Sequence, residues 1–113
     1  DEEVVFDYPA MSERLMNDDE LIALIANTFL EDMPTQIEQL KGFVEHDDID
    51  KVATQAHKIK GAALNVGAMA FSAIALTMEQ AAKKGDWDVI NQNSNLIDQS
   101  FLQIKKTMKE TIE

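Results

Sequence analysis

The sequence predicts an all-α protein, an antiparallel four-helix bundle with a short additional N-terminal helix. Glycine and proline, which disfavour helices, number only 4 and 2 among the 113 residues. Apolar residues recur every three or four positions through four long segments, the spacing of an amphipathic helix. Because the connections between these segments are short, antiparallel packing is the simplest way to bury every apolar stripe. The length suits a single domain, which we expect to span residues 1–113.

The beginning of the chain is predicted to hold an acidic tail and a short helix. Residues 1–7 read as an extended tail, and a helix is expected over residues 8–16. Pro9 supports this helix start, because proline is tolerated in the first helical turn. Asn17 and Asp18 then interrupt the helix and offer N-caps for the next one.

The first long helix is expected over residues 18–46. Its apolar stripe consists of Ile22, Ile25, Phe29, Met33, Ile37, Leu40 and Val44. Pro34 lies inside this stripe, and a proline within a helix removes one hydrogen bond and bends the axis. Because the apolar register continues across Pro34, we expect one kinked helix rather than two.

Three further helices complete the predicted bundle, over residues 48–66, 68–84 and 86–112. Gly67 and Gly85 follow the first two of these helices, at the position where glycine commonly ends a helix. The helices are therefore expected to be separated by tight turns.

The composition argues against several classes of function. The formal net charge is −11, whereas nucleic-acid and anionic-membrane binders need a basic surface, so neither kind of partner is expected. No apolar run approaches the ~18 residues of a spanning helix, so no membrane insertion is expected. The chain has no cysteine, and the cluster of Asp47, Asp48 and Asp50 lacks the glycine and terminal glutamate of a calcium loop. We therefore expect no metal site.

His57 is the candidate functional residue, because it is one of two histidines and lies beside lysines in an acidic chain. At about 100° per residue, it falls on the flank of the helix over 48–66 and not in the apolar stripe. A partly exposed imidazole is largely neutral near pH 7 and can act as a nucleophile. No cluster of acids and bases surrounds it in sequence, so it could accept a group that another protein activates. The alternative is an ordinary surface histidine.

Three neighbours of His57 fit this chemistry. Lys60 lies one turn away and could neutralise a phosphoryl group on the ring, whereas Lys58 lies further round and is expected to steer a partner. Gly61 costs the helix about 0.8–1 kcal/mol relative to alanine. Its missing side chain would clear space beside His57. Alternatively it would permit close helix packing, which is the commoner role of a glycine at such a position.

The central stretch also resembles a known family. His57-Lys58-Ile59-Lys60-Gly61-Ala62-Ala63, followed by Val66-Gly67, closely resembles the signature of histidine-containing phosphotransfer (HPt) domains, the four-helix modules of multistep bacterial and fungal phosphorelays. The resemblance covers almost the whole chain. The family has similar residues at Phe6-Asp7, Asp18-Asp19-Glu20-Leu21, Phe29, Met78-Glu79-Gln80-Ala81-Ala82 and Gly85-Asp86.

The resemblance implies roles for individual residues. His57 would accept a phosphoryl group from an aspartyl phosphate on a receiver domain and pass it to an aspartate on a second receiver. Lys60 would stabilise the phosphoryl group, and Gly61 would make room for it. Glu79 falls where several family members have a glutamine that hydrogen-bonds the histidine ring. A carboxylate there could accept from Nδ1–H and orient Nε2, but it would add negative charge near the phosphoryl group.

The resemblance also implies partners and context. Receiver domains of response regulators would supply the carboxylates and the Mg²⁺, so no cofactor is expected on this chain. The docking surface would include Met11, Leu15 and Met16 of the short helix, together with Leu64. The protein would be a cytoplasmic phosphoryl carrier without autonomous kinase activity, either free-standing or part of a hybrid sensor histidine kinase. The alternative function is a helical adaptor that docks a receiver or another signalling partner without carrying phosphate.

Overall fold

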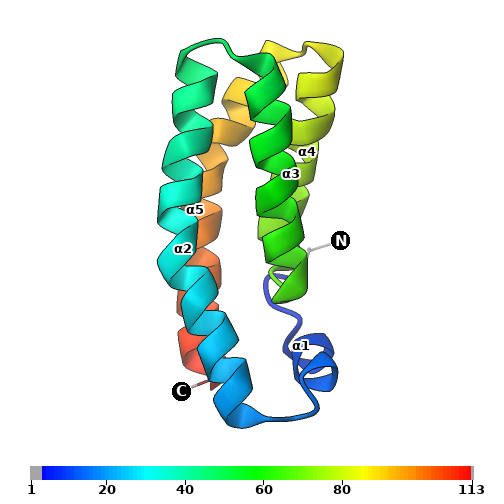
Figure 1. Ribbon diagram of the computed structural model, residues 1–113, viewed down its shortest axis with the longest axis vertical. Helices are drawn as coiled ribbons and strands as arrows, with labels where there is room; N and C mark the ends of the chain where they lie inside the picture. Colours follow the sequence, from blue (N-terminus) through cyan, green and yellow to red (C-terminus); the bar gives the residue numbers. More distant parts are fainter. Residues whose placement is uncertain (1–3, 113) are drawn as a thin grey trace.

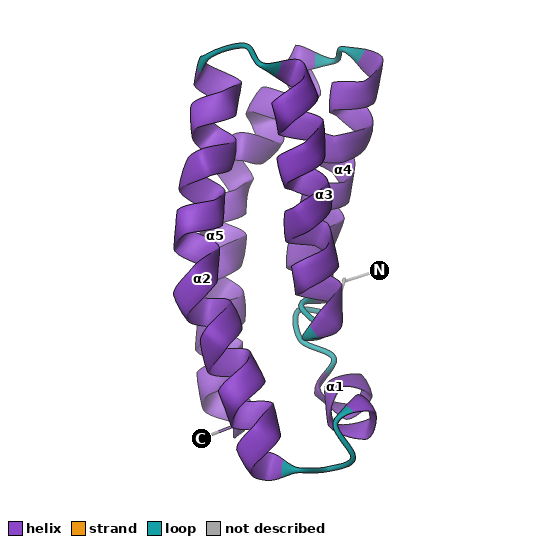
Figure 2. Cartoon of the chain, viewed as in Figure 1, coloured by secondary structure: helices purple, strands orange, loops and turns teal. Residues whose placement is uncertain are grey.

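A computed structural model describes residues 4–112 as five helices joined by short loops, and Figure 2 shows no strand among these residues. The helices are α1 (Tyr8–Arg14), α2 (Asp19–Glu45), α3 (Ile49–Asn65), α4 (Met69–Lys84) and α5 (Trp87–Ile112). None of the described helices combines the length and the apolar character that a membrane span requires.

The four long helices form an antiparallel bundle (Figure 1). α3 packs against α2 and α4, and α5 packs against the same two helices, so α3 and α5 occupy diagonal corners. α1 lies at the end of the bundle where α2 begins and α3 ends (Figure 1). The all-α bundle with a short additional N-terminal helix, predicted from the sequence, is confirmed.

Aspartates begin four of the five helices. A carboxylate oxygen of each accepts a hydrogen bond from a backbone amide three residues later, which satisfies a donor that the helix start leaves unpaired. These N-cap residues are Asp7 of α1, Asp18 of α2, Asp48 of α3 and Asp86 of α5, with distances between 3.1 and 3.3 Å.

α4 begins without a side-chain N-cap. The backbone amides of Met69 and Ala70 instead donate to the carbonyl oxygens of Val5 and Val4, at 3.1 and 3.0 Å. The segment before α1 therefore satisfies the first turn of α4, a role that its acidic composition did not indicate.

α1 ends earlier than the sequence predicts. Its last residue is Arg14, whereas a helix was expected over residues 8–16. Met16 and Asn17 have positive φ values of 55° and 58°, which a right-handed helix does not adopt. The hydroxyl of Ser12 donates to Oδ1 of Asn17 at 2.7 Å and closes this turn. The expected last turn of α1 is thus replaced by the polar turn that leads into α2.

α2 runs through Pro34 as one helix of 27 residues. Pro34 is exposed, so its ring points away from the core, while Met33 and Ile37 on either side are buried. The expectation of one helix rather than two is confirmed, and the apolar register continues across the proline.

The core lies between the four long helices and extends to α1. Phe71 packs against Phe29 and Phe101, with ring centroids 6.1 and 6.0 Å apart. Met11 is fully buried, at 0% exposure, and it anchors α1 to this core. The expected role of Met11 in docking a partner is therefore wrong, because a side chain inside the core presents no surface to another protein.

Candidate functional site

His57 lies on the outer face of α3 with its side chain 64% exposed. One ring nitrogen is occupied, because Nδ1 lies 2.9 Å from Oε2 of Glu79 on α4. Among residues 4–112, no side chain is hydrogen-bonded to the other nitrogen, Nε2. The ring therefore has one edge held by the protein and one edge open to solvent.

Glu79 is the centre of the polar network around His57. Glu79 is only 4% exposed, because it lies where α4 packs on α3. Oε1 accepts a hydrogen bond from Nζ of Lys60 at 2.8 Å, and Oε2 accepts one from Nζ of Lys83 at 3.2 Å, in addition to its contact with His57. Three donors from two helices thus converge on one buried carboxylate.

This network keeps Glu79 ionised. Together these contacts lower the pKa of Glu79 from 4.5 to about 2: the hydrogen bond from Lys60 has the largest effect, those from Lys83 and His57 add to it, and burial opposes them. A carboxylate with this pKa is negatively charged at neutral pH and can only accept hydrogen bonds.

The ionised carboxylate sets the tautomer of the neutral ring. Because Glu79 can only accept, the shared proton belongs to Nδ1 of His57, and the lone pair belongs to Nε2. The exposed nitrogen is therefore the nucleophilic one. The family resemblance implied that a carboxylate at position 79 could accept a hydrogen bond from Nδ1–H of His57, and the structure contains this contact.

The two lysines close to His57 in sequence differ in their surroundings. The side chain of Lys60 is 21% exposed and is bound to Glu79, one helical turn from His57. Lys58 is exposed on α3 and directed to solvent. Lys60 thus lies within the site, and Lys58 lies on the surface beside it.

Gly61 leaves open space on α3. A Cβ atom built on Gly61 would meet nothing within 4 Å, and the residue is exposed. The interpretation that Gly61 permits close helix packing is therefore wrong, because no neighbouring helix approaches it. A clear surface remains one turn from His57.

The other expected docking residues are at least partly accessible. Met16 is 85% exposed and Leu64 is 41% exposed, while Leu15 is half-buried. Nη2 of Arg14 donates to the carbonyl oxygen of Leu64 at 3.1 Å, which holds α1 beside the end of α3. Of the four expected docking residues, only Met11 is inaccessible.

Sequence reasoning missed an apolar groove between α3 and α4. Its cavity measures about 430 Å³, and Lys60 is one of the residues that line it. The exposed apolar side chains that line it are Val4, Leu64, Met69 and Leu76, at 57, 41, 37 and 38% exposure. Leu76 precedes Glu79 by three residues on α4, so this spacing could have placed it beside the site.

Lys83 was also missed as a site residue. A lysine in the last turn of α4 complements the negative end of the helix dipole, so its position alone does not indicate a role in the site. Its i, i+4 spacing from Glu79 was the available signal, but the burial of Glu79 became visible only with the packing of α3 on α4.

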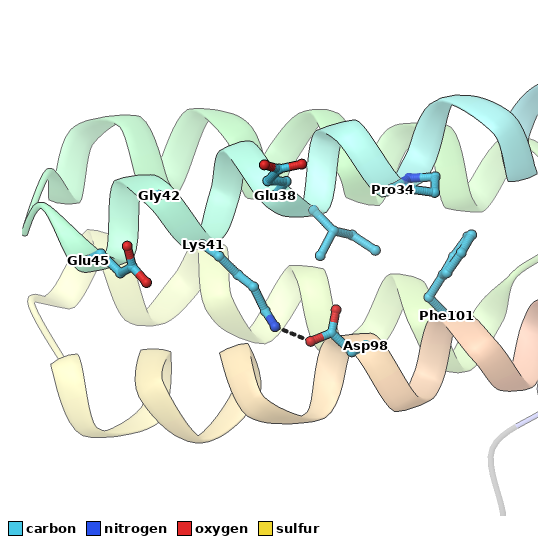
Figure 3. Close-up of a pocket in the computed structure, with 8 residues that line it drawn as sticks. Pro34, Glu38, Lys41, Gly42, Glu45, Asp98 and Phe101 are labelled. Atoms are coloured by element: carbon cyan, nitrogen blue, oxygen red, sulfur yellow. Dashed lines mark hydrogen bonds and ion pairs between the residues drawn. The ribbon is translucent and has the colours of Figure 1, made fainter.

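A second cavity, of about 530 Å³, lies on another side of the bundle between α2 and α5 (Figure 3). Lys41 forms an ion pair with Asp98 across it, and Glu38 and Glu45 lie on its α2 wall. This cavity holds none of the residues around His57. Elsewhere in residues 4–112, no three histidine, aspartate or glutamate side chains lie close enough together to hold a metal ion.

Comparison with protein families matches residues 25–110 to the Hpt domain. The matched region includes α3 and α4 with His57, Lys60, Gly61 and Glu79. No curated protein and no solved structure gave a match.

Proposed function

Because this chain belongs to the Hpt-domain family and is a phosphotransfer module of phosphorelays, we propose that His57 is the residue that carries the phosphoryl group between receiver aspartates. The observation that carries this proposal is the hydrogen bond from Nδ1 of His57 to the buried Glu79, which leaves Nε2 exposed and nucleophilic. At His46, the second histidine, Nδ1 lies 2.7 Å from the neutral carbonyl oxygen of Gly42 at the end of α2, so this contact supplies no carboxylate to balance the charge of a phosphorylated ring.

The proposed step moves a phosphoryl group without any other reactant. The Nε2 lone pair of His57 attacks the phosphorus of an aspartyl phosphate on a receiver. An N–P bond forms as the P–O bond to the aspartate breaks, and the aspartate leaves as a carboxylate. The ring keeps its proton on Nδ1 and becomes cationic, and the Glu79 carboxylate accepts that N–H and balances the charge. Transfer to a second receiver reverses these changes.

Lys60, Gly61 and Lys58 support this step in different ways. Lys60 turns from Glu79 toward the new phosphoryl group and offsets part of its negative charge. Gly61 leaves the room that the phosphoryl group and the receiver surface need. Lys58, exposed at the same face, attracts the acidic phosphorylation site of the receiver.

The surface that docks the receiver is proposed to continue from His57 along α3 and α4 toward α1. We define this docking surface as Leu15, Met16, Leu64, Met69 and Leu76, all of them at least partly accessible. Its apolar groove opens beside Lys60, so a receiver helix seated in it would bring the receiver's acidic site to a cationic one.

The docking surface is tested with Leu76→Asp, which places a charge in the groove. We expect transfer from a phosphorylated receiver to weaken about tenfold, mainly through binding. Leu102→Asp is the matched control, because Leu102 is 64% exposed on α5, diagonally across the bundle from α3, and should leave transfer unchanged. Equal effects of the two substitutions would place the docking surface elsewhere.

The proposed partners follow from the proposed chemistry. Receiver domains of response regulators supply the aspartates and the Mg²⁺ that activates them, and a hybrid sensor histidine kinase is a further candidate partner or parent protein. In this proposal the chain works in the cytoplasm as a carrier and does not phosphorylate itself from ATP.

The experiment that separates a carrier from an adaptor mixes the protein with a receiver that carries aspartyl phosphate. A carrier acquires an acid-labile, base-stable label, and His57→Gln abolishes it while the helical circular dichroism is retained. Binding to receivers without any label on the wild-type protein would support the adaptor function instead. Label on His57→Gln would remove His57 from the mechanism.

A further inference from the structure

Two lysines bind Glu79 in the unphosphorylated protein, although one cation would balance the charge of its carboxylate. Lys60 reaches Oε1 at 2.8 Å from α3, and Lys83 reaches Oε2 at 3.2 Å from the last turn of α4. The side chain of Glu79 is 6% exposed, that of Lys60 is 21% exposed and that of Lys83 is 66% exposed. The buried carboxylate of Glu79 is therefore paired with a mostly buried lysine, Lys60, and with a mostly exposed lysine, Lys83.

Once the ring of His57 is phosphorylated, Lys60 has two possible partners, the Glu79 carboxylate and the phosphoryl group. Lys60 lies one turn from His57 and is the network lysine that shares a helix with the ring. If Lys60 turns to the phosphoryl group, Oε1 of Glu79 loses its cation. Removing one of its cations from a buried carboxylate is costly, even though the ring remains bound to Oε2, so this loss opposes the movement of Lys60.

The position of Lys83 reduces the cost of moving Lys60 away from Glu79. It contacts Oε2, the oxygen that Lys60 does not use, so its contact does not depend on where Lys60 points. We propose that Lys83 is a positioning residue that keeps Glu79 paired with a cation while Lys60 moves to the phosphoryl group on His57. This inference rests on the proposed function, and it adds a residue outside the stretch that carries the resemblance.

The test uses Lys83→Gln, with Lys84→Gln as the matched control. The two lysines are adjacent at the end of α4, but the ion pair to Glu79 is made by Lys83. We expect Lys83→Gln to slow transfer to His57 and to shorten the lifetime of the phosphohistidine, each about twofold to fivefold at low salt. Lys84→Gln should leave both unchanged, and Lys83→Arg should restore most of the loss.

A double-mutant cycle with Lys60→Ala tests the mechanism itself. If Lys83 acts by freeing Lys60, then Lys83→Gln has little further effect once Lys60 is absent. Independent effects of the two substitutions, or equal effects of Lys83→Gln and Lys84→Gln, would overturn the proposal.

A measurement on the unphosphorylated protein separates this inference from the proposed function. The carboxyl carbon resonance of Glu79 reports its pKa, to which His57 and Lys60 of α3 and Lys83 of α4 contribute. Lys83→Gln should raise that pKa, and Lys84→Gln should not. An unchanged Glu79 titration would refute the Lys83 contact while leaving phosphotransfer by His57 intact. Failure of the wild-type protein to accept phosphate from any receiver would overturn both proposals.

Discussion

Replacing Gly61 by alanine separates the stability of α3 from its function, since the two are expected to change in opposite directions. The new Cβ would meet nothing within 4 Å, so no clash offsets the gain in helix propensity. Alanine at an exposed position inside a helix should stabilise the fold by about 0.8–1 kcal/mol. For a domain of this size that corresponds to an increase in Tm of about 4 °C.

Phosphotransfer should respond the other way. The added methyl group lies one turn from His57, on the surface that the receiver must approach, so Gly61→Ala should slow transfer modestly. Gly61→Leu should slow it by about 100-fold, because a displacement of about 1 Å between reacting groups has an effect of that order. Thermal unfolding by circular dichroism and the rate of label transfer from a phosphorylated receiver are the two assays.

Gly42 provides the control for this experiment. It lies inside α2, beside the cavity between α2 and α5, and a Cβ on it would also meet nothing within 4 Å. Gly42→Ala should therefore raise the Tm by a similar amount and leave transfer unchanged. Destabilisation by Gly61→Ala would show that the open space at Gly61 is filled in solution. Normal transfer by Gly61→Leu would show that the space has no function.

Three further predictions concern stability. Glu79 has a native pKa of about 2, below the ordinary 4.5, so its stabilising effect is complete above pH 4.5 and declines as the pH falls toward 2. Urea unfolding at pH 6 and pH 3 should show a loss on the order of 1–2 kcal/mol that Glu79→Gln lacks, and equal losses would contradict the network. Met11→Ala should cost about 3 kcal/mol and Met16→Ala less than about 0.5, since they are 0 and 85% exposed; similar values would contradict the packing of α1. Gly67→Ala should destabilise the fold more than Gly85→Ala. Both glycines have positive φ, but only a Cβ on Gly67 would meet a neighbour, the Asp7 carbonyl oxygen at 2.7 Å. The reverse order in thermal unfolding would refute this contact.

Much of the fold could be predicted because its signals are local. The apolar spacing of the long helices, the N-cap of Asp18 and the left-handed Gly85 after α4 each depend on a few neighbouring residues. The end of α1 was misplaced because Met16 lies in a turn between α1 and α2 that its apolar side chain does not indicate. Met11 was assigned to the docking surface through the family resemblance, and a helix as short as α1 has no stripe long enough to show that this side chain faces the core.

The residues of the candidate site could be predicted, and the family resemblance implied the contact between His57 and Glu79, but the other contacts could not be predicted. His57, Lys60 and Gly61 lie within five residues, so helix periodicity brings them to one region of α3. Periodicity cannot show that Glu79 is buried, because its burial depends on how closely α4 packs on α3. For the same reason the sequence could not decide between packing and open space at Gly61, and it did not connect Lys83 to the site.

The position of the phosphoryl group on the ring tests the central claim most directly. ¹⁵N and ³¹P NMR of the protein, after it is mixed with a receiver carrying aspartyl phosphate, identify the phosphorylated nitrogen. Because Glu79 occupies Nδ1 of His57, the phosphoryl group should be found on Nε2 of His57, with the Nδ1 proton retained. A phosphoryl group on Nδ1 of His57, or on His46, would contradict the account.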